Sequence, residues 1–65
     1  MCQPKVYLIS GGEEKEILRD VIKLRYDGEE IVLETLFEGE TRIKGRLKEI
    51  DFLKAKVVIE DGGKT

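Results

Sequence analysis

The chain has 65 residues, of which 40% are hydrophobic and 40% are charged, with 12 basic and 14 acidic side chains and a net charge of −2. A chain this short forms one small domain with a marginal core, because only about 60% of its unfolded surface is buried on folding. No apolar run approaches the ~20 residues that span a bilayer, and no apolar segment typical of a secretory signal follows the first residues. We therefore expect a cytoplasmic protein.

The residue types that are absent exclude several functions. There is no His, so His-based catalysis and His-rich metal sites are excluded. The chain has one Cys, so it has neither an internal disulfide nor a Cys-x-x-Cys metal motif. A domain of this size does not readily enclose a substrate pocket of several hundred cubic ångströms. We expect a binding protein that is not an enzyme and that forms oligomers.

The first half of the chain predicts two strands and one ambiguous segment. Lys5 to Ser10 is rich in β-branched and aromatic residues, which favours a strand. Between Glu13 and Arg25, apolar residues recur at a spacing that also suits an amphipathic helix. The alternative is a strand over Lys15 to Leu18, paired back through a Gly11-Gly12 turn and followed by a bend at Arg19-Asp20. We favour the strand.

The middle of the chain predicts a β-hairpin. Ile22, Leu24 and Tyr26 alternate with polar residues, and the alternation resumes at Ile31 after the turn dipeptide Asp27-Gly28. Asp-Gly accepts the positive φ angles of a tight hairpin turn.

Two further alternating segments complete the predicted sheet. Ile43, Gly45 and Leu47 alternate with basic residues, and Ala55, Val57 and Ile59 share another strand face. Gly45 in mid-strand suggests a bulge or a barrel corner, and Glu49 to Phe52, which lacks Gly, predicts a single helical turn. Five to six short strands predict an all-β fold, a small SH3-like or OB-type barrel occupying residues 1–65 as one domain.

Cys2 is the most informative residue for function. A lone Cys can be a small buried hydrophobe, but a residue beside the chain start is usually exposed. If Met1 is removed, the Cys2 amine and thiolate form a five-membered chelate. If Met1 is retained, its amine, the Cys2 amide nitrogen and the Cys2 thiolate are the available ligands. Nitrogen and sulfur together suit Ni(II), Cu or Zn rather than Mg or Ca.

One chain offers too few ligands for a square-planar site. Pro4 has no N–H, so it cannot supply a further deprotonated nitrogen. Two chains meeting at a two-fold axis would supply two sulfurs and at least two nitrogens, which predicts a homodimer.

A basic stripe offers an alternative function. Arg42, Lys44, Arg46 and Lys48 alternate along one strand, which places them on one face about 6–7 Å apart. Such a stripe could track an RNA phosphate backbone. A solvated face with acidic partners such as Glu34 or Glu40 is the interpretation we favour, because the net charge is acidic and aromatic residues are few. A third hypothesis is an interaction module that uses an exposed sheet edge and no metal.

Several short motifs, in order, resemble the CooT family of small nickel-binding proteins. The resemblance covers residues 1 to about 60. Its motifs are Met1-Cys2-x-x-Lys5-Val6-Tyr7-Leu8, Asp20-Val21, Asp27-Gly28 with Ile31-Val32-Leu33, Leu36-Phe37, and Gly45-Arg46-Leu47-Lys48-Glu49-Ile50-Asp51.

The resemblance implies an SH3-like barrel, a homodimer, and Ni(II) held through the Cys at position 2. It also implies a metallochaperone role in the maturation of a nickel enzyme such as carbon monoxide dehydrogenase. Related sequences carry an RNA-binding label, which is an analogy at the level of the fold. Pro4 departs from the small residue common at this position in the family. It stiffens the approach to Cys2 and affects which nitrogens reach the metal.

Overall fold

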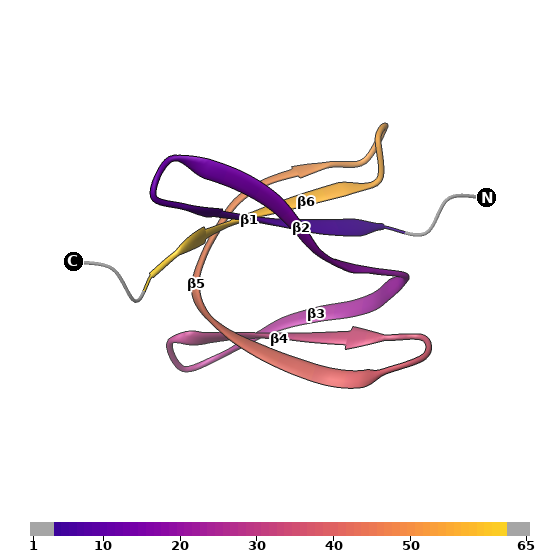
Figure 1. Ribbon diagram of the computed structural model, residues 1–65. Coiled ribbons are helices and arrows are strands. Elements are labelled where there is room, and N and C mark those ends of the chain that lie inside the picture. The colour runs from indigo at the N-terminus through magenta and orange to yellow at the C-terminus, as the bar shows by residue number, and fades with distance from the viewer. Residues whose placement is uncertain (1–3, 63–65) are drawn as a thin grey trace.

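The computed structural model describes residues 4–62, and these residues form six β-strands and no helix (Figure 1). The strands are β1 Lys5–Ser10, β2 Glu13–Arg19, β3 Val21–Asp27, β4 Glu30–Thr35, β5 Gly39–Asp51 and β6 Lys56–Asp61. The all-β prediction is confirmed, and so is the strand interpretation of the ambiguous segment, because β2 and the first part of β3 cover it with a bend at Asp20 between them.

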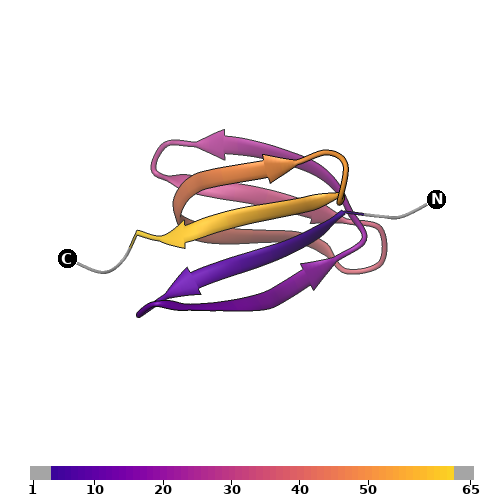
Figure 2. The ribbon, with the colours of Figure 1, turned by 90° about the horizontal axis from the view of Figure 1, so that it is seen from above.

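One sheet, in the order β2-β1-β6-β5-β4-β3, contains all six strands. Neighbouring strands are antiparallel except β1 and β6, which are parallel. β5 is 13 residues long and pairs first with β4 and then with β6. Its curvature folds the sheet into two layers (Figures 1 and 2), as in an SH3-like barrel. The barrel is not closed, because the end strands β2 and β3 do not pair with each other.

Apolar side chains from both layers meet between them. The buried cluster there consists of Val6, Val21, Ile31, Leu33, Val57 and Ile59. Thr35 is buried as well, and its hydroxyl accepts a hydrogen bond from the Glu38 N–H at 2.9 Å and donates one to the Gly39 carbonyl at 3.3 Å. These two bonds satisfy a buried polar group, which would otherwise destabilise the fold.

Turns predicted from the sequence occur where expected. Asp27 pairs with Glu30 across a tight hairpin turn in which Gly28 has a φ of 66°. Gly11 and Gly12 both have positive φ and join β1 to β2. Asp20, with a φ of 60°, forms the bend between β2 and β3. Asp tolerates this left-handed conformation better than most residues.

Gly45 lies at the corner where β5 passes from one layer to the other. A Cβ at this position would clash with the backbone carbonyl oxygen of Glu60 and would lie 3.1 Å from Cγ2 of Ile59. The lack of a side chain therefore lets β5 and β6 approach closely, which confirms the predicted barrel corner.

The helical turn predicted for Glu49 to Phe52 is wrong. β5 continues to Asp51, with an irregularity in its pairing between Leu47 and Glu49, and residues 52–55 form the turn. Pairing of Ile50 with Val57 keeps the segment extended. Asp51 accepts a hydrogen bond from the Lys54 N–H at 3.0 Å, and Ala55 takes a φ of 52°. A side-chain bond and a non-glycine residue in the left-handed region thus close a turn that lacks Gly.

Candidate metal and partner-binding site

The metal ligands predicted from the sequence, Cys2 and Met1, lie outside the described residues. The first described residue, Pro4, shows where the chain enters the barrel. Its carbonyl accepts a hydrogen bond from the Val21 N–H at 3.3 Å, and the Lys5 N–H donates to the Ala55 carbonyl at 2.9 Å. Pro4 is therefore fixed between the start of β3 and the turn that joins β5 to β6.

An apolar groove of about 280 Å³ opens beside Pro4. It lies between β3 and the end of the β5–β6 hairpin, where the barrel is open. Its apolar lining includes Pro4, Ile22, Leu24, Ile50, Phe52 and Val57.

Two lysines and one carboxylate add charge to the groove. The ammonium of Lys23 lies 3.7 Å from Glu34, and that of Lys56 lies 2.9 Å from Glu14. The hydrogen bond to Glu14 raises the pKa of Lys56. Lys56 also sits 4.8 Å from the centre of the Tyr7 ring. Both lysines are thus partnered within the chain, and Asp51 supplies one negative group.

Large apolar side chains are exposed on two turns at this end of the barrel. Phe52 is 88% exposed and Leu53 is 95% exposed, both in the turn after β5. Phe37, in the turn between β4 and β5, is 77% exposed. The Leu36 N–H donates to the Asp20 carbonyl at 2.9 Å, which ties that turn to the start of β3. Figure 1 shows both turns at the end of the barrel where residue 4 lies.

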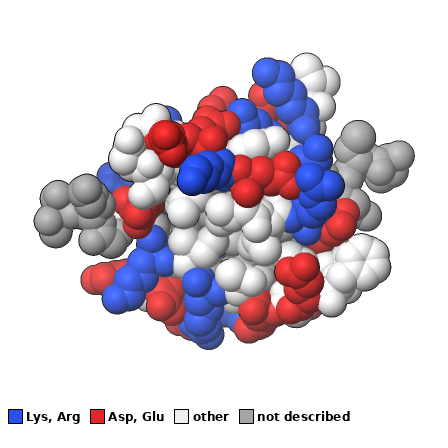
Figure 3. All heavy atoms as spheres, in the orientation of Figure 1, with Lys and Arg blue, Asp and Glu red and all other residues white. Residues whose placement is uncertain are grey.

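The strand predicted to carry the basic stripe presents mixed charges. The Arg42 guanidinium donates to Asp27 at 2.9 Å and to Glu30 at 3.1 Å, and these bonds raise its pKa. Beside it, Arg25 pairs with Glu40 at 3.2 Å. Figure 3 shows basic and acidic side chains interspersed around a central area of other residues. The Arg42 guanidinium thus donates hydrogen bonds to two carboxylates of its own chain. Binding of an RNA phosphate would require these N–H groups to be available.

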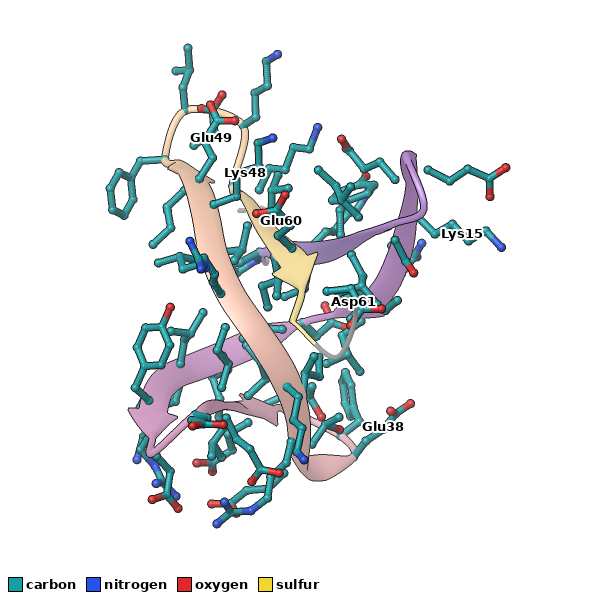
Figure 4. All side chains as sticks on the ribbon, turned by 90° about the vertical axis from the view of Figure 1, so that its left-hand side faces the viewer. Lys15, Glu38, Lys48, Glu49, Glu60 and Asp61 are labelled. Atoms are coloured by element: carbon teal, nitrogen blue, oxygen red, sulfur yellow. The ribbon has the colours of Figure 1, made fainter. Side chains whose placement is uncertain are left out.

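The other three basic residues differ from Arg42. None of the ion pairs among residues 4–62 involves Lys44, Arg46 or Lys48. Arg46 is opposite Glu60 in the β5–β6 register, and Lys48 lies at the irregularity in that pairing. Figure 4 shows Lys48 on the same stretch of β5 as Glu49, beside Glu60 of β6. Acidic neighbours thus accompany the stripe along its length. The expected partners Glu34 and Glu40 instead pair with Lys23 and Arg25.

Within the described part of the chain, no three His, Cys, Asp or Glu side chains converge as a metal site. No helix in that part is long and apolar enough to cross a membrane. The metal prediction therefore rests on Cys2 and Met1.

Comparison with known proteins assigns the family. The sequence model of one protein family, described as the CO dehydrogenase accessory protein CooT, matches residues 1–60, nearly the whole chain. The chain belongs to the CooT family. The matched region includes Cys2 and Met1 as well as the groove and both exposed turns.

A solved structure supports the CooT assignment. The crystal structure of a candidate CooT protein from Carboxydothermus hydrogenoformans superposes with a TM-score of 0.81 at 25% sequence identity. The match covers 92% of this chain and 97% of that one. No significant match exists among curated proteins.

The groove and its exposed rim are features of this CooT chain that sequence reasoning missed. One signal was available: Phe52-Leu53 stands between Asp51 and Lys54, so two large apolar residues interrupt a charged segment. These two side chains are exposed because residues 52–55 form a tight turn. The sequence analysis predicted a helical turn over Glu49 to Phe52 instead, so it did not predict this exposure.

Proposed function

We propose that this chain is a nickel-binding homodimer that serves the maturation of a nickel-containing CO dehydrogenase, with Cys2 of each subunit as a metal ligand. The observation that carries the proposal is the match to the CO dehydrogenase accessory protein over residues 1–60, which includes Cys2. The protein delivers or retains the metal and performs no reaction on it.

The donor chemistry supports nickel as the cargo. Cys2 is the chain's one thiol, and the chain has no imidazole. Its thiolate joins nitrogen from the adjacent backbone, and such sulfur–nitrogen sets suit Ni(II). The nitrogens come from the Cys2 amine if Met1 is removed, or from the Met1 amine and the Cys2 amide if it is retained. The usual divalent order favours copper over nickel, so selectivity for nickel depends on geometry and supply.

A dimer follows from the number of ligands. Pro4 supplies no amide nitrogen, so one chain falls short of the four donors of a square-planar site. Two chains related by a two-fold axis provide matching sets of donors around one ion. The expected stoichiometry is one nickel per two chains.

Nickel titration of the wild type, Cys2→Ala and the control Gln3→Ala tests the proposal. We expect thiolate-to-nickel absorption in the wild type and in Gln3→Ala, saturating at one metal per two chains. Cys2→Ala should lose this absorption and at least tenfold in affinity. Unchanged affinity and stoichiometry in Cys2→Ala would refute the proposal, and so would full-affinity binding by a monomer.

The RNA-binding alternative remains a prediction with less support. Arg42 is held by Asp27 and Glu30, and Glu60 stands opposite Arg46 in the strand register. A stripe with acidic neighbours attracts a polyanion weakly, since nonspecific binding depends on the net number of phosphates neutralised.

A further inference from the structure

We infer that two residues with left-handed backbone conformations, Asp20 and Ala55, hold the start of the chain in place and thereby set its affinity for nickel. Both are positioning residues, because they act through the backbone and not as metal ligands. The inference rests on the proposed function, since it assigns the part of the barrel that fixes the chain next to Cys2.

The backbone conformations of Asp20 and Ala55 are unusual. Among residues 4–62 they are the two non-glycine residues with positive φ, at 60° and 52°. L-residues rarely adopt this conformation, and Ala lacks the short polar side chain that helps Asp and Asn to do so. Such conformations persist only where the surrounding structure imposes them, and they cluster at functional sites. Their location therefore indicates where the protein depends on an exact backbone path.

Both residues lie at the hydrogen bonds that fix the start of the chain. The Lys5 N–H donates to the carbonyl of Ala55 itself at 2.9 Å. The N–H of Val21, the residue directly after Asp20, donates to the Pro4 carbonyl at 3.3 Å. We call Asp20, Ala55 and these two bonds the clamp.

The clamp holds a single peptide unit from both sides. The Pro4 carbonyl and the Lys5 N–H are the two polar groups of one peptide bond, and a trans peptide unit is planar with these groups pointing in opposite directions. The carbonyl is bound by the first residue of β3, and the N–H is bound by the turn before β6. The two bonds together therefore fix the orientation of this peptide plane.

The segments that carry the two left-handed residues are themselves held in place. The Asp20 carbonyl accepts a hydrogen bond from the Leu36 N–H at 2.9 Å, which ties the bend between β2 and β3 to the turn after β4. Ala55 ends the turn in which Asp51 accepts a bond from the Lys54 N–H at 3.0 Å. Figure 1 shows this bend, this turn and residue 4 at the same end of the barrel. Bonds within the barrel thus maintain both sides of the clamp.

The clamp limits the freedom of the metal-binding chain start. Cys2 precedes Pro4 by two residues, and two residues span at most about 7 Å. Fixing the peptide unit between Pro4 and Lys5 therefore restricts the space that the Cys2 thiolate can reach. A group held near its bound position loses less conformational freedom on binding, which raises affinity. An opened clamp should lower nickel affinity and leave the donor atoms chemically unchanged.

Substitutions that differ in their tolerance of positive φ test the inference. Ala55→Val introduces a β-branched side chain, which is strongly disfavoured in the left-handed region. Ala55→Gly adopts this region freely, and Ala55→Asn tolerates it while adding a side chain larger than Ala. Asp20→Val and Asp20→Asn form the corresponding pair at the other residue, and Asp20→Asn also removes the charge of Asp20.

A control variant separates the clamp from a general loss of stability. Gly45→Ala introduces a Cβ that clashes with the carbonyl oxygen of Glu60, at the opposite end of the β5–β6 pairing from Ala55. It should destabilise the barrel and leave the clamp intact. Its nickel affinity should therefore equal that of the wild type.

Hydrogen exchange in the metal-free protein measures the clamp, and nickel titration measures its effect. We expect the Lys5 amide to exchange several-fold faster in Ala55→Val, and the Val21 amide to do so in Asp20→Val. Both Val variants should lose about tenfold in nickel affinity, which corresponds to about 1.4 kcal/mol. At saturating nickel they should reach the full thiolate-to-nickel absorption, because Cys2 is intact.

The tolerant variants decide whether the left-handed conformation is the cause. Ala55→Gly, Ala55→Asn and Asp20→Asn should keep the nickel affinity and the amide exchange of the wild type. A loss of affinity in these variants equal to that of the Val variants would overturn the inference. Wild-type nickel affinity in both Val variants would overturn it as well, and so would wild-type exchange of the Lys5 and Val21 amides.

The inference and the proposed function fail in different ways. If Cys2→Ala loses nickel binding while both Val variants keep wild-type affinity, the clamp is wrong and the metal assignment survives. If Cys2→Ala binds nickel like the wild type while the Val variants bind it more weakly, the assignment of Cys2 is wrong and the clamp survives.

Discussion

Gly45 shows how one missing side chain determines the shape of the barrel. Its backbone approaches β6 so closely that a Cβ would collide with the carbonyl of Glu60, and a Cβ at Gly62 would lie 2.8 Å from the Gly45 Cα. Replacing Gly with Ala reduces the conformational entropy of the unfolded chain, which by itself stabilises the folded state by about 0.4–1 kcal/mol. Overpacking costs about 1–3 kcal/mol, so the steric term dominates.

We expect Gly45→Ala to lower the free energy of unfolding by about 1 kcal/mol, the difference between the middle values of these two ranges. Urea denaturation followed by circular dichroism measures this change. The control is the exposed neighbour Lys44→Ala, which should stay within about 0.5 kcal/mol of the wild type. Equal stability of Gly45→Ala and Lys44→Ala would show that β5 can turn this corner with a side chain present.

Strands β3 and β5 are joined across the barrel opening by a side chain. The Leu47 N–H donates a hydrogen bond to the Tyr26 hydroxyl at 2.8 Å, linking strands that are not neighbours in the sheet. Tyr26 is about half exposed, so solvent partly replaces the bond when it breaks. We expect Tyr26→Phe to cost about 0.5 kcal/mol, the low end for a hydrogen bond.

Hydrogen exchange at Leu47 tests the link between β3 and β5. The Leu47 amide should exchange several-fold faster in Tyr26→Phe, since it loses its acceptor. Tyr7→Phe is the matched control, because the Tyr7 hydroxyl makes no hydrogen bond within residues 4–62 and its ring keeps Lys56 at its face. Equal Leu47 exchange in both variants would contradict a role for the Tyr26 hydroxyl.

The sequence allowed most strands to be predicted because the hydrophobic alternation is local. The Asp27-Gly28 hairpin and the Gly11-Gly12 turn follow from short-range backbone preferences. The path of residues 49–55 does not, since it depends on pairing between Ile50 and Val57 and on the left-handed Ala55. The ion pairs of Arg42 likewise depend on which strands are neighbours.

The candidate site was only partly predictable for a related reason. The donor chemistry of Cys2 and Met1 follows from residue type. The groove does not, because it forms where β3 and the β5–β6 hairpin, distant in sequence, leave the barrel open. Its contact with Pro4 depends on hydrogen bonds to Val21 and from Lys5 that no local pattern encodes.

At the scale of the whole molecule, the core is small, so a contact between two copies would contribute substantially to stability. In residues 4–62 eight hydrophobic residues are buried, and a domain of this length has a marginal free energy of unfolding. If the native state is the dimer, a tenfold rise in protein concentration stabilises each chain by about 0.7 kcal/mol, half of RT ln 10. For a domain of this size, that corresponds to a rise in Tm of roughly 3–5 °C.

Thermal unfolding at several concentrations, with and without nickel, separates the two contributions. Under the proposed function, the wild type should show a higher Tm at higher concentration and a further rise with nickel, because a ligand that binds only the folded dimer stabilises it. Cys2→Ala should keep the concentration dependence and lose the nickel response, because the substitution removes a proposed metal ligand and leaves residues 4–62 unchanged. A wild-type Tm independent of concentration would mean that the folded unit is the single chain, and the shared metal site would then have no structural basis.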